Sequence, residues 1–131
     1  MMADDTSGIR SKKKILIADD DAGILDATKL LLEAFDYDVI VDPNGKLLQS
    51  NIKELPDLIL LDIWMSGING KDICLKLKKQ RKTTSIPVIM VSANKDTSDI
   101  AKQAGADDYI AKPFDSSTLI TKIEKYTSGK I

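Results

Sequence analysis

Residues 56–74 read PDLILLDIWMSGINGKDIC, and this stretch contains the features that decide the predicted fold. Its apolar run, Leu58–Leu61, is continuous rather than alternating with polar residues, which is typical of a parallel strand covered on both faces. Asp62 follows the run directly, and the turn pair Asn69-Gly70 precedes apolar residues at helical spacing. The stretch therefore predicts a buried strand, an acidic residue at its carboxyl end and a helix after it.

Four other short apolar runs occur along the chain, separated by amphipathic segments of helix length. The runs are Ile15–Ala18, Val39–Val41, Val88–Val91 and Tyr109–Ala111. Apolar spacing predicts helices over 24–35, 46–52, a segment after Gly70, 97–104 and a segment around Leu119–Ile123, and Asp20 or Asp21 can cap the first of them. Five βα units of this kind predict an α/β fold, a (βα)5 three-layer sandwich with helices on both faces of a five-stranded parallel sheet.

The composition excludes several classes of function. Lys plus Arg is 19 and Asp plus Glu is 20, so the net charge of −1 argues against a basic surface for nucleic acid or for a membrane. Because the chain has no histidine and a single cysteine, Cys74, it lacks Ser-His-Asp and Cys-His catalytic sets, the usual zinc ligands and an internal disulfide. The cysteine usage fits a reducing compartment, and we expect a cytoplasmic protein.

The chain length of 131 residues predicts one domain. We expect a flexible N-terminal tail over 1–11, a folded domain over 12–127 and a C-terminal tail over 128–131. The N-terminal residues lack the apolar region of a secretory signal, and no apolar run approaches the roughly 18 residues of a membrane-spanning helix. We expect no DNA-binding or catalytic domain in this chain, which is then either a stand-alone domain or part of a longer protein.

Polar residues follow four of the five predicted strands. Asp19–Asp21 follow the first strand, Asp62 the third, Ser92 the fourth and Lys112 the fifth, whereas Asp42-Pro43 after the second is interpreted as a turn. In an open parallel sheet, sites form outside the carboxyl ends of the strands. With Asp21 turned toward the following helix, we expect three carboxylates, a hydroxyl and an ammonium group to meet at one edge of the sheet.

Each of these residues also has a structural interpretation, because acidic residues and serines commonly cap helices or stabilise turns. Their combination favours a site instead. Three carboxylates a few ångströms apart repel one another, and a cation removes that conflict. With oxygen ligands alone, a hard ion such as Mg²⁺ is indicated. A carboxylate beside Mg²⁺, an ammonium and a hydroxyl can attack phosphorus, while the positive charges stabilise the transferring phosphoryl oxygens.

Four segments together resemble the response-regulator receiver domain of two-component and phosphorelay signalling. They are KILIADDD (14–21), PDLILLDIWMSGINGKDIC (56–74), IPVIMVSA (86–93) and GADDYIAKPF (105–114), and they follow the family's order. The resemblance covers about Lys13–Tyr126 and implies a flavodoxin-like sheet with strand order 2-1-3-4-5. It also implies a phosphohistidine donor on another protein, a histidine kinase or a phosphotransfer protein, since this chain has no histidine.

The resemblance implies a metal-binding role for four residues at the predicted site. Asp62 would be the phosphoacceptor and a ligand of Mg²⁺. Asp20 would be a direct Mg²⁺ ligand, and Asp19 would act mostly through water. The backbone carbonyl of Trp64 would supply a further ligand.

The resemblance also implies how the site binds phosphate and signals. Lys112 would bind the phosphoryl group, with the Lys112-Pro113 peptide in the cis form, and Ser92 would donate a hydrogen bond to that group. Tyr109 would be an aromatic switch that turns from exposed to buried as Ser92 moves. The face formed by Thr97–Tyr126 would then bind a downstream protein or a second copy in a phosphorylation-dependent homodimer, without nucleic acid or membrane binding by this chain.

One residue departs from the family pattern, because Ser66 stands where proline is usual four residues after the acceptor. Proline would fix the loop's φ angle, so we expect Ser66 to leave the loop more mobile. Three other functions remain as alternatives: a receiver-like binding scaffold that is never phosphorylated, a flavodoxin-like electron carrier and an aspartate-nucleophile phosphatase. The acidic run 19–21 disfavours the phosphate loop of an electron carrier, and Trp64 stands where the phosphatase motif needs a second aspartate.

Overall fold

The computed structural model describes residues 12–50, 52–65 and 67–128, and within them five parallel strands form one sheet. The strands are β1 (Lys14–Ala18), β2 (Asp38–Asp42), β3 (Leu58–Asp62), β6 (Val88–Ser92) and β7 (Asp108–Ala111). Their spatial order is β2-β1-β3-β6-β7, and every neighbouring pair is parallel. Counted along the chain within this sheet the order is 2-1-3-4-5, so the predicted fold class and strand order are confirmed.

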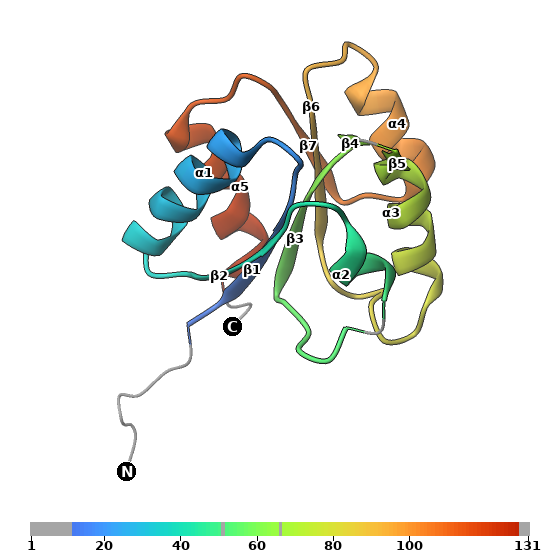
Figure 1. Ribbon diagram of the computed structural model, residues 1–131, viewed down its shortest axis with the longest axis horizontal. Helices are drawn as coiled ribbons and strands as arrows, with labels where there is room; N and C mark the ends of the chain where they lie inside the picture. Colours follow the sequence, from blue (N-terminus) through green and yellow to red (C-terminus); the bar gives the residue numbers. More distant parts are fainter. Residues whose placement is uncertain (1–11, 51, 66, 129–131) are drawn as a thin grey trace.

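Helices cover both faces of the sheet, with α1 and α5 on one side and α2, α3 and α4 on the other (Figure 1). Their bounds are α1 (Ala22–Ala34), α2 (Lys46–Gln49), α3 (Gly70–Lys79), α4 (Thr97–Ala104) and α5 (Ser116–Thr127). The continuous apolar strands supply a core to each layer. In β3, for example, Ile59 and Leu61 pack with the α3 side, whereas Leu58 and Leu60 pack with the α1–α5 side. The buried sheet therefore holds the strand ends in a fixed arrangement.

Side-chain caps fix where the site-forming helices begin. The Asp21 carboxylate accepts a hydrogen bond from the Ile24 amide, so Asp21 rather than Asp20 caps α1. Asn69 caps α3 in the same way, and Asp115 caps α5. After α4, Gly105 has a φ of 79°, the left-handed conformation expected of a glycine that ends a helix. The caps at Asp21, Asn69 and Asp115 place the starts of α1, α3 and α5 at the carboxyl edge of the sheet.

Two predicted helices end earlier than the apolar spacing suggests. The helix predicted over 46–52 is limited to α2, Lys46–Gln49, because Ser50 is extended and donates its hydroxyl hydrogen bond to the Leu47 carbonyl. The first helix ends at Ala34, and Phe35 is half-exposed beyond it rather than buried on its apolar face. Apolar spacing therefore overestimated both helices at their C-terminal ends.

The turn predicted for Asp42-Pro43 begins at Pro43, one residue later than expected. Asp42 is the last residue of β2, and its buried carboxylate accepts hydrogen bonds from the Leu47 and Leu48 amides at the start of α2. The structure also contains a small antiparallel hairpin that the sequence did not predict, formed by β4 (Trp64–Met65) and β5 (Ile68–Asn69). This hairpin carries the chain from the end of β3 to the start of α3.

Several predictions fall on residues outside the described part of the chain. The predicted tails, 1–11 and 128–131, lie outside the described residues, except for Ser128, which follows the last residue of α5. Ser66 also lies outside the described residues. The domain boundaries therefore stay a prediction. Within the described ranges, none of the helices is both long enough and apolar enough to cross a membrane.

Candidate functional site

The carboxyl ends of β1, β3, β6 and β7 meet around an open cleft of about 480 Å³. Its lining residues are Asp19, Asp20, Asp21, Asp62, Trp64, Ser92, Ala93, Asn94 and Lys112. The cleft thus brings together every residue predicted for metal or phosphoryl binding. Tyr109, the predicted switch, lies apart from this lining.

Three carboxylates form an acidic cluster in the cleft. Asp19 and Asp62 are buried, with 4% and 6% exposure, whereas Asp20 is exposed. One carboxylate oxygen from each lies within 4.8 Å of the other two. Asp21 serves a different purpose, because it caps α1 and its amide donates to the Asp19 Oδ1 atom at 2.9 Å. The cluster offers oxygen ligands from two strand ends at metal-binding distance.

Lys112 supplies the positive charge that faces this cluster. Its Nζ atom lies 2.8 Å from Asp19 Oδ2 and 3.4 Å from Asp62 Oδ2. Burial acts to lower the pKa of Lys112, but hydrogen bonds and negative charge from these two aspartates outweigh it and raise the pKa. Three ionised carboxylates against one ammonium leave two excess negative charges, which fits a divalent cation with oxygen ligands.

Asp62 has an environment that disfavours its ionised form. Burial is the largest cause, and with the negative charge of Asp19 it raises the pKa of Asp62 from 3.8 to about 6, against the opposing charge of Lys112. The Trp64 amide lies 3.3 Å from Asp62 Oδ1 and also opposes the shift. At neutral pH the carboxylate is mostly ionised, yet it is more basic than an exposed aspartate. Such an oxygen is suited to nucleophilic attack.

Ser92 ends β6 at the cleft, while Tyr109 lies on the neighbouring strand at the surface. The Ser92 side chain is buried, and its Oγ atom accepts a hydrogen bond from the Asn94 amide at 3.0 Å. In the β6–β7 register Ser92 pairs with Ala111, and Tyr109 pairs with Met90, which precedes Ser92 by two residues on β6. The Tyr109 side chain is 40% exposed. The two predicted switch residues are therefore neighbours on adjacent strands, with one facing the cleft and the other at the surface.

Gly70 has a role in the site that sequence reasoning missed. A Cβ atom at this position would lie 2.4 Å from the Asp62 carbonyl oxygen and 2.8 Å from Ile63 Cα, far closer than real contacts allow. The Gly70 amide also donates to the Ile63 carbonyl at 2.7 Å. The start of α3 thus packs directly against the backbone that holds Asp62. The Asn69-Gly70 pair predicts a turn from the sequence, but the close approach of Gly70 to β3 depends on packing between the two segments.

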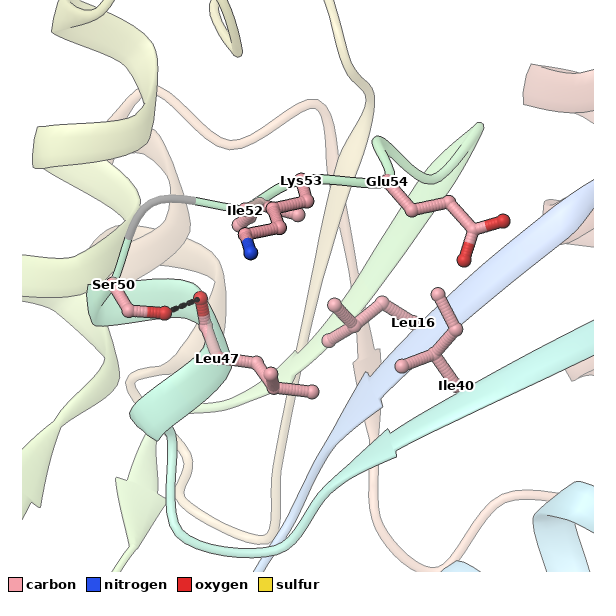
Figure 2. Close-up of a pocket in the computed structure, with 7 residues that line it drawn as sticks. All are labelled: Leu16, Ile40, Leu47, Ser50, Ile52, Lys53 and Glu54. Carbon is pink, nitrogen blue, oxygen red and sulfur yellow. Dashed lines mark hydrogen bonds between the residues drawn. The ribbon is translucent and has the colours of Figure 1, made fainter.

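A second hollow, of about 390 Å³, lies between α2 and the strands β1 and β2 (Figure 2). Its lining is mainly aliphatic and comprises Leu16, Ile40, Leu47 and Ile52, with Ser50, Lys53 and Glu54. One helical turn in α2 covers little of the sheet, which leaves this hollow open. The converging carboxylates and Lys112 are at the other site, so the polar cleft is the candidate functional site.

Comparison with known proteins gives one consistent family. A family model described as the response regulator receiver domain matches residues 15–124. The DNA-binding response regulator MtrA of Mycobacterium tuberculosis is 36% identical over 115 residues, which cover 86% of this chain and 49% of MtrA. The chain thus spans about half the length of the curated relatives it matches.

Two solved structures illustrate the structural similarity. A putative response regulator from Chloroflexus aurantiacus superposes with a TM-score of 0.83 at 30% identity, covering 91% of this chain and all of the other. The receiver domain of the sensor histidine kinase PA1611 from Pseudomonas aeruginosa gives a TM-score of 0.82 at 23% identity, with the same coverage of both chains, and that structure has a magnesium ion coordinated in its active-site cleft.

Proposed function

The chain belongs to the response regulator receiver domain family, and from this premise we propose that it accepts a phosphoryl group on Asp62. The donor is a phosphohistidine on a histidine kinase or a phosphotransfer protein. The observation that carries the proposal is the buried Asp62 carboxylate, which lies beside the Asp19–Asp20 pair and 3.4 Å from the Lys112 ammonium. Asp19 and Asp20 line the same cleft but follow β1, whereas Asp62 ends β3 and faces them across the cleft.

The proposed transfer is a displacement at phosphorus. An Asp62 carboxylate oxygen forms a P–O bond as the donor's P–N bond breaks, and the departing imidazole keeps the electron pair and takes up a proton. Lys112, already 3.4 Å from Asp62, stabilises the negative charge on the phosphoryl oxygens. The Ser92 hydroxyl donates a hydrogen bond to the same group. Hydrolysis later forms a P–O bond to water and breaks the bond to Asp62, which releases phosphate and restores the carboxylate.

We propose Mg²⁺ as the ion held by the acidic cluster. Asp20 and Asp62 are proposed as direct ligands, Asp19 as a ligand mostly through water, and the Trp64 backbone carbonyl as a further ligand. The oxygen-only donors and the excess of two negative charges support this choice. When bound, the ion neutralises charge on the transferring phosphoryl group.

The output of the proposed switch is a protein-binding face. Phosphorylation adds negative charge and acceptor oxygens beside Ser92, which moves toward them and leaves room for Tyr109 to turn inward. The face from Thr97 to Tyr126 then binds a downstream protein, or a second copy of this chain in a phosphorylation-dependent homodimer. The near-neutral charge supports a protein partner, with no nucleic acid or membrane bound by this chain. The single cysteine fits the cytoplasmic location that we propose.

Intact-mass spectrometry tests the proposed acceptor. After incubation with acetyl phosphate and Mg²⁺, the wild-type chain is expected to gain the mass of one phosphoryl group, and neutral hydroxylamine, which cleaves acyl phosphates, should remove it. Asp62→Asn should gain none, whereas Asp21→Asn, which alters a helix cap beside the same cleft, should still be phosphorylated. Incorporation at the wild-type level in Asp62→Asn would place the acceptor elsewhere.

A further inference from the structure

The surface ring of Tyr109 is contacted by a cation from α5. The Lys122 Nζ atom lies 5.7 Å from the ring centroid, within the distance at which an ammonium is attracted to an aromatic face. Since the Tyr109 side chain is 40% exposed, this contact is made while the ring is turned outward. Turning the ring inward would give up the contact with Lys122. The cation therefore favours the outward orientation over the inward one.

Lys122 is held in place by a carboxylate on the strand that carries Tyr109. Its Nζ atom lies 2.9 Å from Asp108 Oδ1, and the Asp108 carboxylate is largely buried. Burial acts to raise the pKa of Asp108, but the hydrogen bonds from Lys122, the Tyr109 amide and Tyr126, with the charge of Lys122, outweigh it and lower the pKa. Asp108 is thus a charged anchor that keeps the Lys122 ammonium beside the Tyr109 ring.

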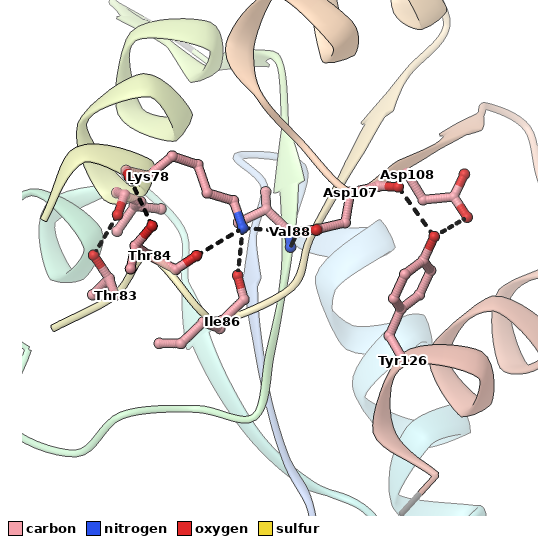
Figure 3. Close-up of polar contacts among 9 residues, drawn as sticks. Lys78, Thr83, Thr84, Ile86, Val88, Asp107, Asp108 and Tyr126 are labelled. Atoms are coloured by element: carbon pink, nitrogen blue, oxygen red, sulfur yellow. Dashed lines mark hydrogen bonds and ion pairs between the residues drawn. The ribbon is translucent and has the colours of Figure 1, made fainter. Parts of the chain in front are cut away.

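The anchor itself is tied to the rest of the fold (Figure 3). The Tyr126 hydroxyl lies 3.1 Å from Asp108 Oδ2 and 3.0 Å from the Asp107 carbonyl. The Asp107 carboxylate accepts hydrogen bonds from the Val88 amide and from Lys78 Nζ, both at 2.8 Å. Exposed ion pairs commonly contribute little, because two long side chains must be ordered to form them. Here the Asp108 carboxylate is already ordered by the Tyr109 amide and the Tyr126 hydroxyl.

We propose that Lys122 is a positioning residue that holds Tyr109 outward in the unphosphorylated protein and so sets the resting balance of the switch. The orientation of Tyr109 follows from this chain's own contacts, whereas its consequence for signalling rests on the proposed function. An exposed cation–π contact changes the ratio of two states by about two- to fivefold. Loss of Lys122 should therefore raise the inward fraction of Tyr109 by about that factor.

The test measures the Tyr109 side-chain orientation directly in the full chain. Three-bond NMR couplings from the Tyr109 Cγ atom to its backbone nitrogen and carbonyl carbon report the χ1 populations, in wild type, Lys122→Met and Lys122→Arg. Lys125→Met is a matched control, because Lys125 lies on the same helix with its Nζ atom 5.2 Å from the ring centroid of a different tyrosine, Tyr126. Amide spectra of each variant show that it is folded.

The proposal expects changed χ1 populations in Lys122→Met and wild-type populations in Lys122→Arg and Lys125→Met. Wild-type populations in Lys122→Met, or an equal change in Lys125→Met, would overturn it. A second measurement adds beryllofluoride and Mg²⁺, and Lys122→Met should reach half of its amide response at a two- to fivefold lower concentration. If the χ1 populations change as expected but the wild type does not respond to beryllofluoride, the positioning role stands and the proposed phosphoacceptor function fails.

Discussion

Replacing Asp62 with asparagine is expected to stabilise the metal-free protein at neutral pH. Burial and the charge of Asp19, opposed by Lys112, raise the pKa of Asp62 from 3.8 to about 6, so the folded state disfavours the ionised carboxylate. Asparagine has nearly the same shape and does not ionise. The variant therefore removes an unfavourable charge and leaves the backbone packing around it in place.

The size and sign of the effect follow from proton binding. Between about pH 4 and pH 6 the folded protein binds more protons at Asp62 than the unfolded chain does, so the free energy of unfolding falls as the pH rises through this interval. A rise of about 2 pKa units corresponds to about 3 kcal/mol. Since asparagine also loses the charge pairing with Lys112, we expect a gain of about 1–3 kcal/mol near pH 7.5. The gain should become small near pH 4, where the wild-type carboxyl is protonated.

Urea unfolding in the presence of EDTA measures this difference at several pH values. Asp26→Asn removes the same charge from an exposed position on α1 and serves as the control, with little expected change. Adding Mg²⁺ should shift the stability difference toward wild type. A ligand at 100 times its Kd stabilises the folded state by about 2.7 kcal/mol, and the asparagine variant lacks one proposed ligand.

Two results would refute this reasoning. One is a metal-free Asp62→Asn variant that is less stable than wild type near pH 7.5. The other is a stability difference that stays constant from pH 4 to pH 8, because a titrating carboxyl must produce a difference that depends on pH.

Three further predictions concern the site. Asp20→Ala should weaken Mg²⁺ binding, measured by the fluorescence of the single tryptophan. Asp21→Ala should leave Mg²⁺ binding intact and lower the free energy of unfolding by about 1 kcal/mol, because α1 loses its cap. Equal Mg²⁺ affinities for Asp20→Ala and wild type would contradict the ligand assignment. In the same urea assay, Gly70→Ala should lower the free energy of unfolding by about 1–3 kcal/mol, because the new Cβ would lie 2.4 Å from the backbone of β3. The control Gly23→Ala, within α1, should be neutral or slightly stabilising. Ser92→Ala should still be phosphorylated, but its β7 amides should show smaller NMR shift changes on phosphorylation than those of wild type. Shift changes of wild-type size there would show that Ser92 is not part of the switch.

The features that local sequence could predict are those that local chemistry determines. Continuous apolar runs predict the strands, and the acidic run before α1 predicts a cap at Asp20 or Asp21, of which Asp21 is the cap in the structure. Because the carboxyl ends of parallel strands share one edge, the sequence alone places the residues after four runs in one cleft. The positions of Asp19, Asp62 and Lys112 around that cleft agree with this expectation.

The features that could not be predicted depend on contacts between distant or irregular segments. The β4–β5 hairpin has only two residues in each strand, too few for a periodic pattern. The buried role of Asp42 depends on the approach of the α2 amides, and that of Gly70 depends on the backbone of β3 lying behind it. The anchoring of Lys122 by Asp108 joins residues 14 positions apart on a helix and a strand, which only the packed structure brings together.

The most direct test of the central claim is chemical mapping of the phosphorylated residue. The wild-type chain is incubated with a phosphorylated histidine-containing donor and Mg²⁺, the acyl phosphate is reduced with borohydride, and the modified residue is identified by peptide mass spectrometry. The proposed function predicts that Asp62 is converted to homoserine and that Asp19 and Asp20 are unchanged. Reduction at another aspartate, or phosphate that resists borohydride and is retained on a hydroxyl side chain, would contradict it.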